Sequence, residues 1–416
     1  MLSRRVFLKN GAFAMVSLGF APSFLARTAY ASNGSTRTKR LIAIFQRGAV
    51  DGLNVVVPFG EAEYYRARPS LAIPGPSAAD DEAAIDLDGF FGLHPRLRPL
   101  KPLWDARQLA IVHACGSPDS TRSHFDAQDY METATPGTKS TADGWLNRYL
   151  QARHADASAP FRAVSVATGL PRMLQGRAPA VALHQIDQFA IRAGQSSDRV
   201  SALFERAYGI SPDSVLNGTG RETFDAIRLL KIADPAQYEP EHGADYPKSP
   251  FGQALRQIAQ LTKANVGLEV AFADIGGWDT HVNQGAAQGH LAVRLDDFAR
   301  SIAALMTDLG DRMADTVVLT MSEFGRAVKE NGNRGTDHGH GNAMLVIGGG
   351  VGGGRVYGRW PGLDVERRFD GRDLAVTTDF RDVFAEIVVR HLGVGDASPI
   401  FPGYRVSTAR FAGLFA

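Results

Sequence analysis

Short, nearly continuous apolar runs recur along the chain and alternate with segments whose apolar residues have helical spacing. The clearest runs are residues 41–45, 109–114, 161–167, 266–275, 316–321 and 343–349. A strand with one wet face alternates polar and apolar residues, whereas a continuous apolar run is typical of a strand covered on both faces. The pattern therefore predicts a sheet that is buried between other elements.

Helical spacing is strongest between the fourth and fifth of these runs. One stripe repeats at intervals of four and three residues, through Leu291, Leu295, Phe298, Ile302, Leu305 and Leu309. A shorter stripe lies at Phe251, Leu255, Ile258 and Leu261. Thr378 is the expected N-cap of a further helix that runs to His391. Helices that recur between strands indicate an α/β fold with a mostly parallel sheet.

The chain has 416 residues, of which 44% are hydrophobic, so it can bury a large core. We expect a single domain over residues 32–416. Residues 185–250 are polar and helix-prone, and we interpret them as an insertion or cap over the sheet. The loop-rich segment 73–89 is expected on the surface.

The N-terminal residues 1–31 have the pattern of a twin-arginine signal peptide. "SRRVFLK" at residues 3–9 precedes an apolar run at 11–25 and a small-x-small "AYA" that predicts cleavage after Ala31. A membrane anchor is the alternative, but the run is interrupted by polar residues and is shorter than the ~20 residues that span a bilayer. We expect export by the twin-arginine translocase to the periplasm or beyond, without a stable membrane anchor.

Charge and cysteine content exclude two classes of function. Removing the four basic residues of the leader changes the formal charge from +1 to −3, which argues against nucleic-acid binding. Cys115 is the only cysteine, so the chain can form neither an internal disulfide nor a cysteine-rich metal site.

Acids and histidines cluster next to the predicted strands. They are Asp51 after the first run, Asp279 and His281 after the fourth, Glu323 after the fifth, and Asp337, His338 and His340 in "GTDHGHGN" just before the sixth. A single acid after a strand is usually a turn or cap residue, but the carboxyl ends of parallel strands meet at one edge. Mixed nitrogen and oxygen ligands there predict one or two divalent ions, Zn²⁺ or Mn²⁺ rather than Ca²⁺ or Mg²⁺ unless oxygens dominate.

A further motif, "DSTRSHFDAQDYME", follows the second run. Ser123 is placed at the start of a helix with Asp126 three residues on, which fits either a helix cap or a nucleophile beside a metal. Arg122 is positioned to bind an anionic substrate group. His124 and Thr121 are the alternatives to Ser123.

Several motifs occur in an order that resembles the bacterial family called domain of unknown function 1501. They include "FQRGAVDGLNVVVP", "RSHFDAQDYME", "GGWDTH", "SEFGR" and "TDHGHGN". Members of that family resemble the alkaline phosphatase and sulfatase superfamily, which implies a three-layer sandwich with a mostly parallel central sheet, helices on both faces and a helical insertion.

The resemblance also implies roles for the site residues. Asp51 would bind metal, Ser123 would be the nucleophile, and Asp279 with His281 would bind a second metal. "SEFGR" matches the superfamily's next Asp-His pair only through Glu323, and the last histidine would be His338 or His340.

Three functions remain open from the sequence. The first is a periplasmic metal-dependent hydrolase of phosphate or sulfate esters, acting on an anionic small-molecule or glycan substrate. The second is a non-catalytic exported binding protein that keeps the fold. The third is a metal-dependent isomerase or transferase.

Overall fold

The computed structural model describes residues 15–17, 38–153, 161–184, 186 and 238–415. Most of the leader and most of the predicted cap, residues 187–237, lie outside the described residues. The described residues form a mixed α/β fold around a mostly parallel central sheet, as the sequence predicts.

The described part of the sheet contains ten strands in the order β1-β8-β7-β9-β2-β10-β11-β6-β12, with β13 also paired to β6. Strand β2 is central and runs parallel to both β9 and β10. Its side chains alternate between two cores, with Ile42 and Ile44 in one and Leu41, Ala43 and Phe45 in the other. Burial on both faces explains why the sequence shows a continuous apolar run rather than alternation.

The strands have the following bounds: β1 Met15–Ser17, β2 Arg40–Arg47, β3 Val56–Val57, β4 Ile85–Asp86, β5 Gly92–Leu93, β6 Leu109–Gly116, β7 Ala163–Val166, β8 Ala180–Leu183, β9 Val270–Gly276, β10 Thr316–Met321, β11 Asn342–Gly348, β12 Arg355–Tyr357 and β13 Thr378–Asp379. The α-helices are α1 Gly52–Val55, α2 Ala62–Ala67, α3 Lys101–Asp105, α4 His124–Thr133, α5 Trp145–Ala152, α8 Pro250–Lys263, α9 His290–Leu309 and α10 Phe380–Glu386.

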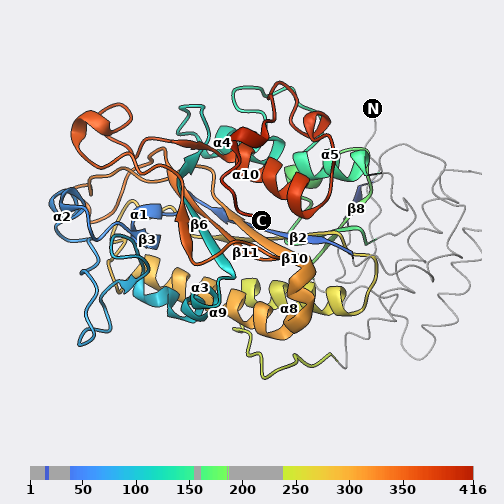
Figure 1. The fold of residues 1–416 in the computed structure, drawn as a ribbon, viewed down its shortest axis with the longest axis horizontal. Helices are drawn as coiled ribbons and strands as arrows, with labels where there is room; N and C mark the ends of the chain where they lie inside the picture. Colours follow the sequence, from blue (N-terminus) through green and yellow to red (C-terminus); the bar gives the residue numbers. More distant parts are fainter. Residues whose placement is uncertain (1–14, 18–37, 154–160, 185, 187–237, 416) are drawn as a thin grey trace, which may run out of the picture.

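Helices cover both faces of the sheet. Figure 1 shows α3, α8 and α9 on one face and α4, α5 and α10 on the other. The predicted stripes are confirmed, because Ile258 of α8 and Leu295 of α9 are fully buried in the first core. Trp145 of α5 stacks on Phe384 of α10 in the second core, with ring centroids 4.5 Å apart. The helix after β13 is capped by Asp379 instead of Thr378, and it ends in a π-helical turn at Ile387–His391.

Strand β11 runs antiparallel to both of its neighbours, β10 and β6. No helix lies between Met321 and Asn342, so the chain returns beside β10 without the crossover that a parallel pair needs. The connection is a long loop at the carboxyl end of β10. It carries the glycine-rich motif.

None of the helices in the described part of the chain is long and apolar enough to span a membrane.

Candidate metal centre

Loops at one edge of the sheet bring together residues from three parts of the sequence. The loop after β9 supplies Asp279 and His281, and the loop between β10 and β11 supplies His338. His124 is the first residue of α4, which follows β6. Since β9, β10 and β6 all point the same way, their carboxyl ends meet at this edge.

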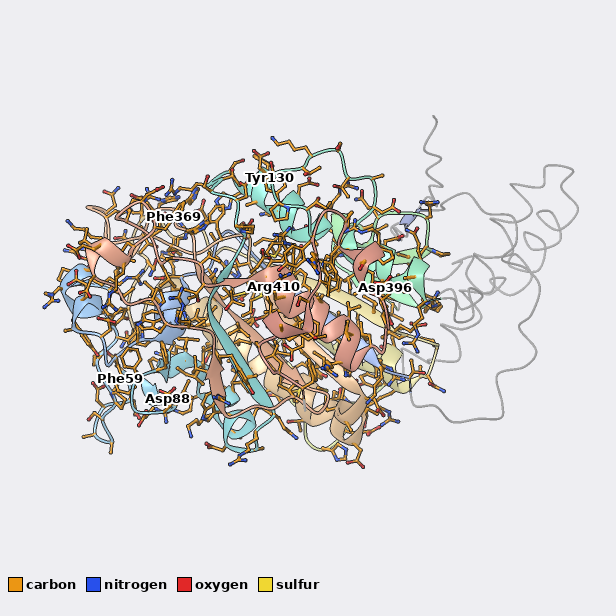
Figure 2. The ribbon with its side chains drawn as sticks, turned by 45° about the horizontal axis from the view of Figure 1, so that its top comes forward. Phe59, Asp88, Tyr130, Phe369, Asp396 and Arg410 are labelled. Atoms are coloured by element: carbon orange, nitrogen blue, oxygen red, sulfur yellow. The ribbon has the colours of Figure 1, made fainter. Side chains whose placement is uncertain are left out.

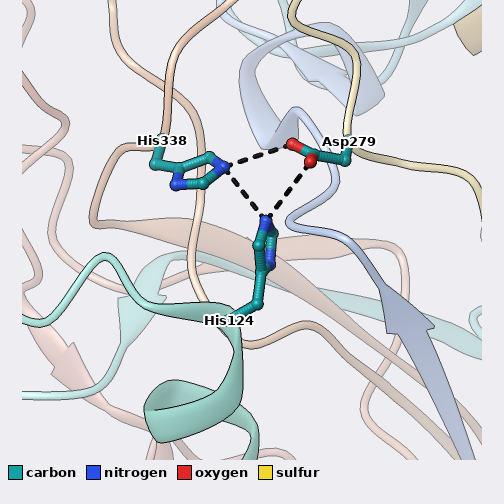
Figure 3. Close-up of side chains that lie close together, drawn as sticks. All are labelled: His124, Asp279 and His338. Atoms are coloured by element: carbon teal, nitrogen blue, oxygen red, sulfur yellow. Dashed lines mark hydrogen bonds and ion pairs between the residues drawn. The ribbon is translucent and has the colours of Figure 1, made fainter.

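Three imidazoles and one carboxylate converge within this cluster. The Nε2 atom of His338 lies 3.0 Å from Nε2 of His124 and 2.9 Å from Nε2 of His281. An oxygen of Asp279 lies 3.2 Å from the same His338 atom and 3.0 Å from Nε2 of His281. Figure 3 shows Asp279 and His338 facing His124. Ligand atoms of His124, Asp279 and His338 all lie within 4.8 Å of one another, so these residues could hold a metal ion.

The outward nitrogen of each ring faces an oxygen that accepts a hydrogen bond. Nδ1 of His124 lies 2.8 Å from Glu323 Oε1, and Nδ1 of His338 lies 3.0 Å from the carbonyl oxygen of Arg122. Nδ1 of His281 lies 3.3 Å from Asp337 Oδ1. Because a carbonyl or carboxylate oxygen can only accept, Nδ1 carries the proton and leaves a lone pair on Nε2. This arrangement is typical of metal-binding histidines in proteins.

The spacing of three of these groups also fits a single ion. Four ligands at about 2.1 Å from a zinc ion in a tetrahedron lie about 3.4 Å apart. Nε2 of His338 lies 3.0 Å from Nε2 of His124 and 3.2 Å from Asp279 Oδ1, and Nε2 of His124 lies 3.5 Å from Asp279 Oδ2. His281 lies beside His338 and Asp279 but outside the group whose ligand atoms are all within 4.8 Å of one another. One Nε2 atom cannot make good hydrogen bonds to three partners at once, so a cation at their centre explains the convergence better than hydrogen bonding does.

Arg326 fixes the only carboxylate of the cluster. Its guanidinium is buried and donates from Nη2 to Asp279 Oδ1 at 2.6 Å. It also donates to the carbonyl oxygens of Gly48, Ala49, Trp278 and Thr336. Arg326 therefore holds the loops after β2, β9 and β10 in register around the cluster.

The local charges favour an ionised acid and a neutral ring at the centre. Burial raises the pKa of Asp279, but the hydrogen bond and charge of Arg326 outweigh it and leave the pKa below its usual value. Burial lowers the pKa of His338, and so do the charge that His124 carries when it is protonated and the charge of Arg326. A carboxylate and a deprotonated imidazole nitrogen are the forms that bind metals.

Glu323 and Asp337 support the histidines from outside the cluster. Glu323 is fully buried, and Oε1 accepts from His124, from Gln128 Nε2 at 2.8 Å and from the backbone of Gly48 at 2.8 Å. Burial raises the pKa of Glu323, but these hydrogen bonds, led by the one from His124, bring it below its ordinary value. Both acids were predicted as direct ligands. The structure instead places Glu323 and Asp337 behind the histidines, where Glu323 contacts His124 and Asp337 contacts His281.

Asp51 does not join the cluster. Its carboxylate is buried and accepts two hydrogen bonds from Arg68, at 2.6 and 3.0 Å, and one from Gln284 at 2.6 Å. Because a buried guanidinium already neutralises it, Asp51 has neither the charge nor the free lone pairs of a metal ligand in this arrangement. The sequence-based assignment of Asp51 as a ligand is therefore not supported by the geometry.

The glycine-rich motif places one of its two histidines in the cluster and the other outside it. His338 lies in the cluster, whereas the buried ring of His340 stacks on Phe369 with centroids 4.3 Å apart. Phe369 is labelled among the side chains in Figure 2. Glycine is needed beside His338 because a Cβ on Gly339 would lie 2.2 Å from the backbone of Arg326.

Ser123 and Arg122 lie immediately before His124. Ser123 is the N-cap of α4, and its Oγ accepts from the backbone of Asp126 at 3.5 Å. Arg122 donates from Nε and Nη2 to Asp373. The two guanidinium nitrogens that were expected to bind a substrate anion therefore bind a carboxylate of the protein.

From the sequence, His124 was expected only as an alternative to Ser123, whereas the structure places it in the cluster as a candidate ligand. The available signal was its position one residue after the predicted N-cap, in the segment that follows β6 at the same edge of the sheet.

Residues 108–391, more than half of the sequence, match the family described as Protein of unknown function (DUF1501). The chain is also similar to the crystal structure of the PsFucS1 sulfatase from Pseudoalteromonas sp., at 12% sequence identity and a TM-score of 0.37. That similarity covers 91% of this chain and 72% of the sulfatase chain. None of the curated proteins compared with the sequence matches it.

Proposed function

Because the chain belongs to the DUF1501 family, whose description assigns no activity, we propose its function from the site: metal-dependent hydrolysis of phosphate or sulfate esters. The observation that carries the proposal is the convergence of three imidazole Nε2 atoms and the Asp279 carboxylate. Each imidazole is also fixed by an oxygen acceptor on its other nitrogen.

The donor set favours Zn²⁺ or Mn²⁺. Three imidazole nitrogens and one carboxylate suit these ions, whereas Ca²⁺ and Mg²⁺ prefer sites made of oxygen. We propose one ion per chain, held by His124, His338 and Asp279, with His281 beside them as a further donor. When bound, it would supply Lewis-acid stabilisation of the negative charge that develops on the ester oxygens.

The exposure and the charge of the site support an anionic substrate for the proposed hydrolysis. The side chains of Asp279 and His281 are 46% and 39% exposed, so a ligand can reach the cluster from solvent. With a divalent ion bound, the residues of the cluster contribute a single negative charge, so the centre would attract anions. Export to the periplasm remains our expectation from the leader sequence.

We propose Ser123 as the nucleophile. Its oxygen lies at the N-terminus of α4, next to His124, where the helix end stabilises developing negative charge. In the step proposed, a bond forms from Oγ to phosphorus or sulfur as the ester bond breaks. The hydroxyl proton passes to water, the leaving alkoxide takes a proton from water, and a second water then releases the inorganic anion from Ser123.

The decisive experiment measures metal content and turnover of aryl phosphate and aryl sulfate esters together. We expect stoichiometric Zn or Mn, turnover that a chelator removes, and loss of both in His338→Ala. His340→Gln is the matched control in the same loop and should retain the metal. Ser123→Ala should lower turnover at least about a hundredfold while leaving metal content unchanged. Unchanged turnover in Ser123→Ala would exclude it as the nucleophile.

A non-catalytic binding protein is the second candidate. The burial of Asp51 against Arg68 favours it, because one acid expected in the catalytic centre serves the fold instead. Stoichiometric metal with no turnover of either ester class would favour this function over the hydrolase.

A further inference from the structure

Two arginines beside the metal centre share one buried carboxylate. Arg122 donates to Asp373 Oδ2 from Nε at 3.1 Å and from Nη2 at 2.7 Å. Arg372 donates from Nε to Oδ1 at 2.8 Å and from Nη2 to Oδ2 at 3.2 Å. Asp373 is fully buried, so its position is fixed by the fold. It therefore holds both guanidiniums in defined orientations.

Both arginines also contact the candidate ligand His338. The carbonyl oxygen of Arg122 accepts from Nδ1 of His338 at 3.0 Å, and Nη2 of Arg372 donates to the carbonyl oxygen of His338. The pair of arginines is thus attached to the metal centre by two separate contacts.

The two arginine side chains are partly exposed to solvent. The side chains of Arg122 and Arg372 are 33% and 43% exposed, although their shared partner is buried. Among the described residues, neither Nη1 group has a hydrogen-bond partner. Each arginine therefore presents a free pair of N–H donors from a pre-organised position, which lowers the entropic cost of binding an anion.

The acids near the arginine pair, apart from the buried Asp373, are exposed to solvent. Two guanidiniums oppose the buried charge of Asp373, and two exposed acids lie nearby: Asp370, whose oxygen lies 3.3 Å from Arg122 Nη2, and Asp337, whose pKa is lowered in part by the charge of Arg372. Asp370 is 60% exposed, and an ion pair in contact with water contributes little. An oxyanion from solution can compete with it for Arg122.

We propose that Arg122 and Arg372 form a subsite for a second anionic group of the substrate, distinct from the ester group at the metal centre. This rests on the proposed function and deepens it. The substrate class is a phosphate or sulfate ester whose alcohol portion carries another oxyanion, such as a carboxylate or a second sulfate. The arginine pair replaces the bidentate Arg122 contact expected from the sequence.

The first test measures binding of inorganic sulfate by the full chain with the metal centre emptied by a chelator. Wild-type protein should bind sulfate, Arg122→Gln should bind it about tenfold more weakly, and the Arg122→Gln/Arg372→Gln variant more weakly still. Arg122→Gln should keep the contact to His338, because the backbone carbonyl oxygen of residue 122 makes that contact. Arg300→Gln, which removes a surface arginine of α9, is the control. Equal affinity in the wild type and the double variant would overturn the proposal.

The second test separates the subsite from the reaction. The double variant should raise KM for an aryl ester that carries a carboxylate about tenfold more than for the unsubstituted ester, with a smaller effect on kcat. Equal changes for both esters would contradict a second-anion subsite. Absence of turnover in the wild type would count against the hydrolase alone, since the sulfate titration does not depend on it.

Discussion

His94 and His113 differ from the histidines of the cluster in which ring nitrogen carries the proton. Both are buried, and both accept a backbone hydrogen bond at Nδ1, from Arg96 at 3.1 Å and from Ala114 at 2.8 Å. At Nε2 both face a carbonyl oxygen, of Ala286 and Val56. They are therefore neutral with the proton on Nε2, the opposite tautomer from the candidate ligands.

The lowered pKa values of His94 and His113 predict a loss of stability in acid. Burial lowers the pKa of both His94 and His113 to about 4, well below the value of 6.5 in an unfolded chain. As the pH falls below 6.5, the unfolded state takes up protons that the folded state does not. Each histidine should then cost about 2 kcal/mol of unfolding free energy between pH 7.5 and pH 5.

Urea unfolding across this pH range checks the prediction. His113→Phe should reduce the steepness of the decline, whatever it does to stability at pH 7.5. A wild-type free energy of unfolding that stays flat down to pH 5 would contradict it.

At the scale of single residues, the sequence predicted which side chains meet better than it predicted their roles. Asp279, His281 and His338 were all identified from their positions beside strands, and all lie in the cluster. Asp51 was misassigned because its partner, Arg68, is seventeen residues away and approaches through the fold. Whether an acid is free to bind an ion depends on its neighbours in space, which a strand-end pattern does not specify.

Helix α4 presents two residues to the same acid. His124 and Gln128 are separated by four positions and so lie on one face of the helix, where both contact Glu323 Oε1. Gln128 in turn accepts from Arg47 Nη1 at 2.9 Å. Gln128 therefore keeps the Glu323 carboxylate aligned with the ring of His124.

We predict that Gln128→Ala weakens metal binding about tenfold, as loss of a supporting contact around a ligand typically does. Competition with a metal indicator measures the affinity. Gln151→Ala, which removes an amide on α5 away from the cluster, should leave it unchanged. Equal effects of the two substitutions would mean that Gln128 serves only the general stability of the fold.

At the scale of elements, the helices and strands followed from periodicity, but the direction of β11 did not. The sequence offers an apolar run there like any other. The absence of a helical stripe between Met321 and Asn342 was the signal that the chain must turn back antiparallel. The same absence leaves room for the loop that carries His338.

For the whole molecule, metal binding should appear as added stability. An ion that binds only the folded state contributes about 2.7 kcal/mol at a free concentration one hundred times its Kd. For a chain of this size that corresponds to a rise in Tm of about 3 °C. Scanning calorimetry with and without a chelator measures the difference.

Two variants make the calorimetric test specific. His338→Ala should unfold at the same temperature with and without metal, whereas His340→Gln should keep the increment. An increment that persists in His338→Ala would place the ion elsewhere in the protein.

The layered architecture was predictable because it depends on which faces are apolar, and that information is local. Most of the predicted cap lies outside the described residues. Substrate preference depends on side chains that come together only in the folded molecule, such as Arg122 and Arg372 on Asp373.

The buried guanidinium of Arg326 has a consequence for the order of assembly. Because it joins Gly48, Trp278 and Asp279 by hydrogen bonds of its own, the ligand loops need no ion to take their places. Such a chain can complete its fold first and acquire its metal afterwards. The ion that occupies it would then depend on which metals are abundant at its destination, as well as on intrinsic affinity.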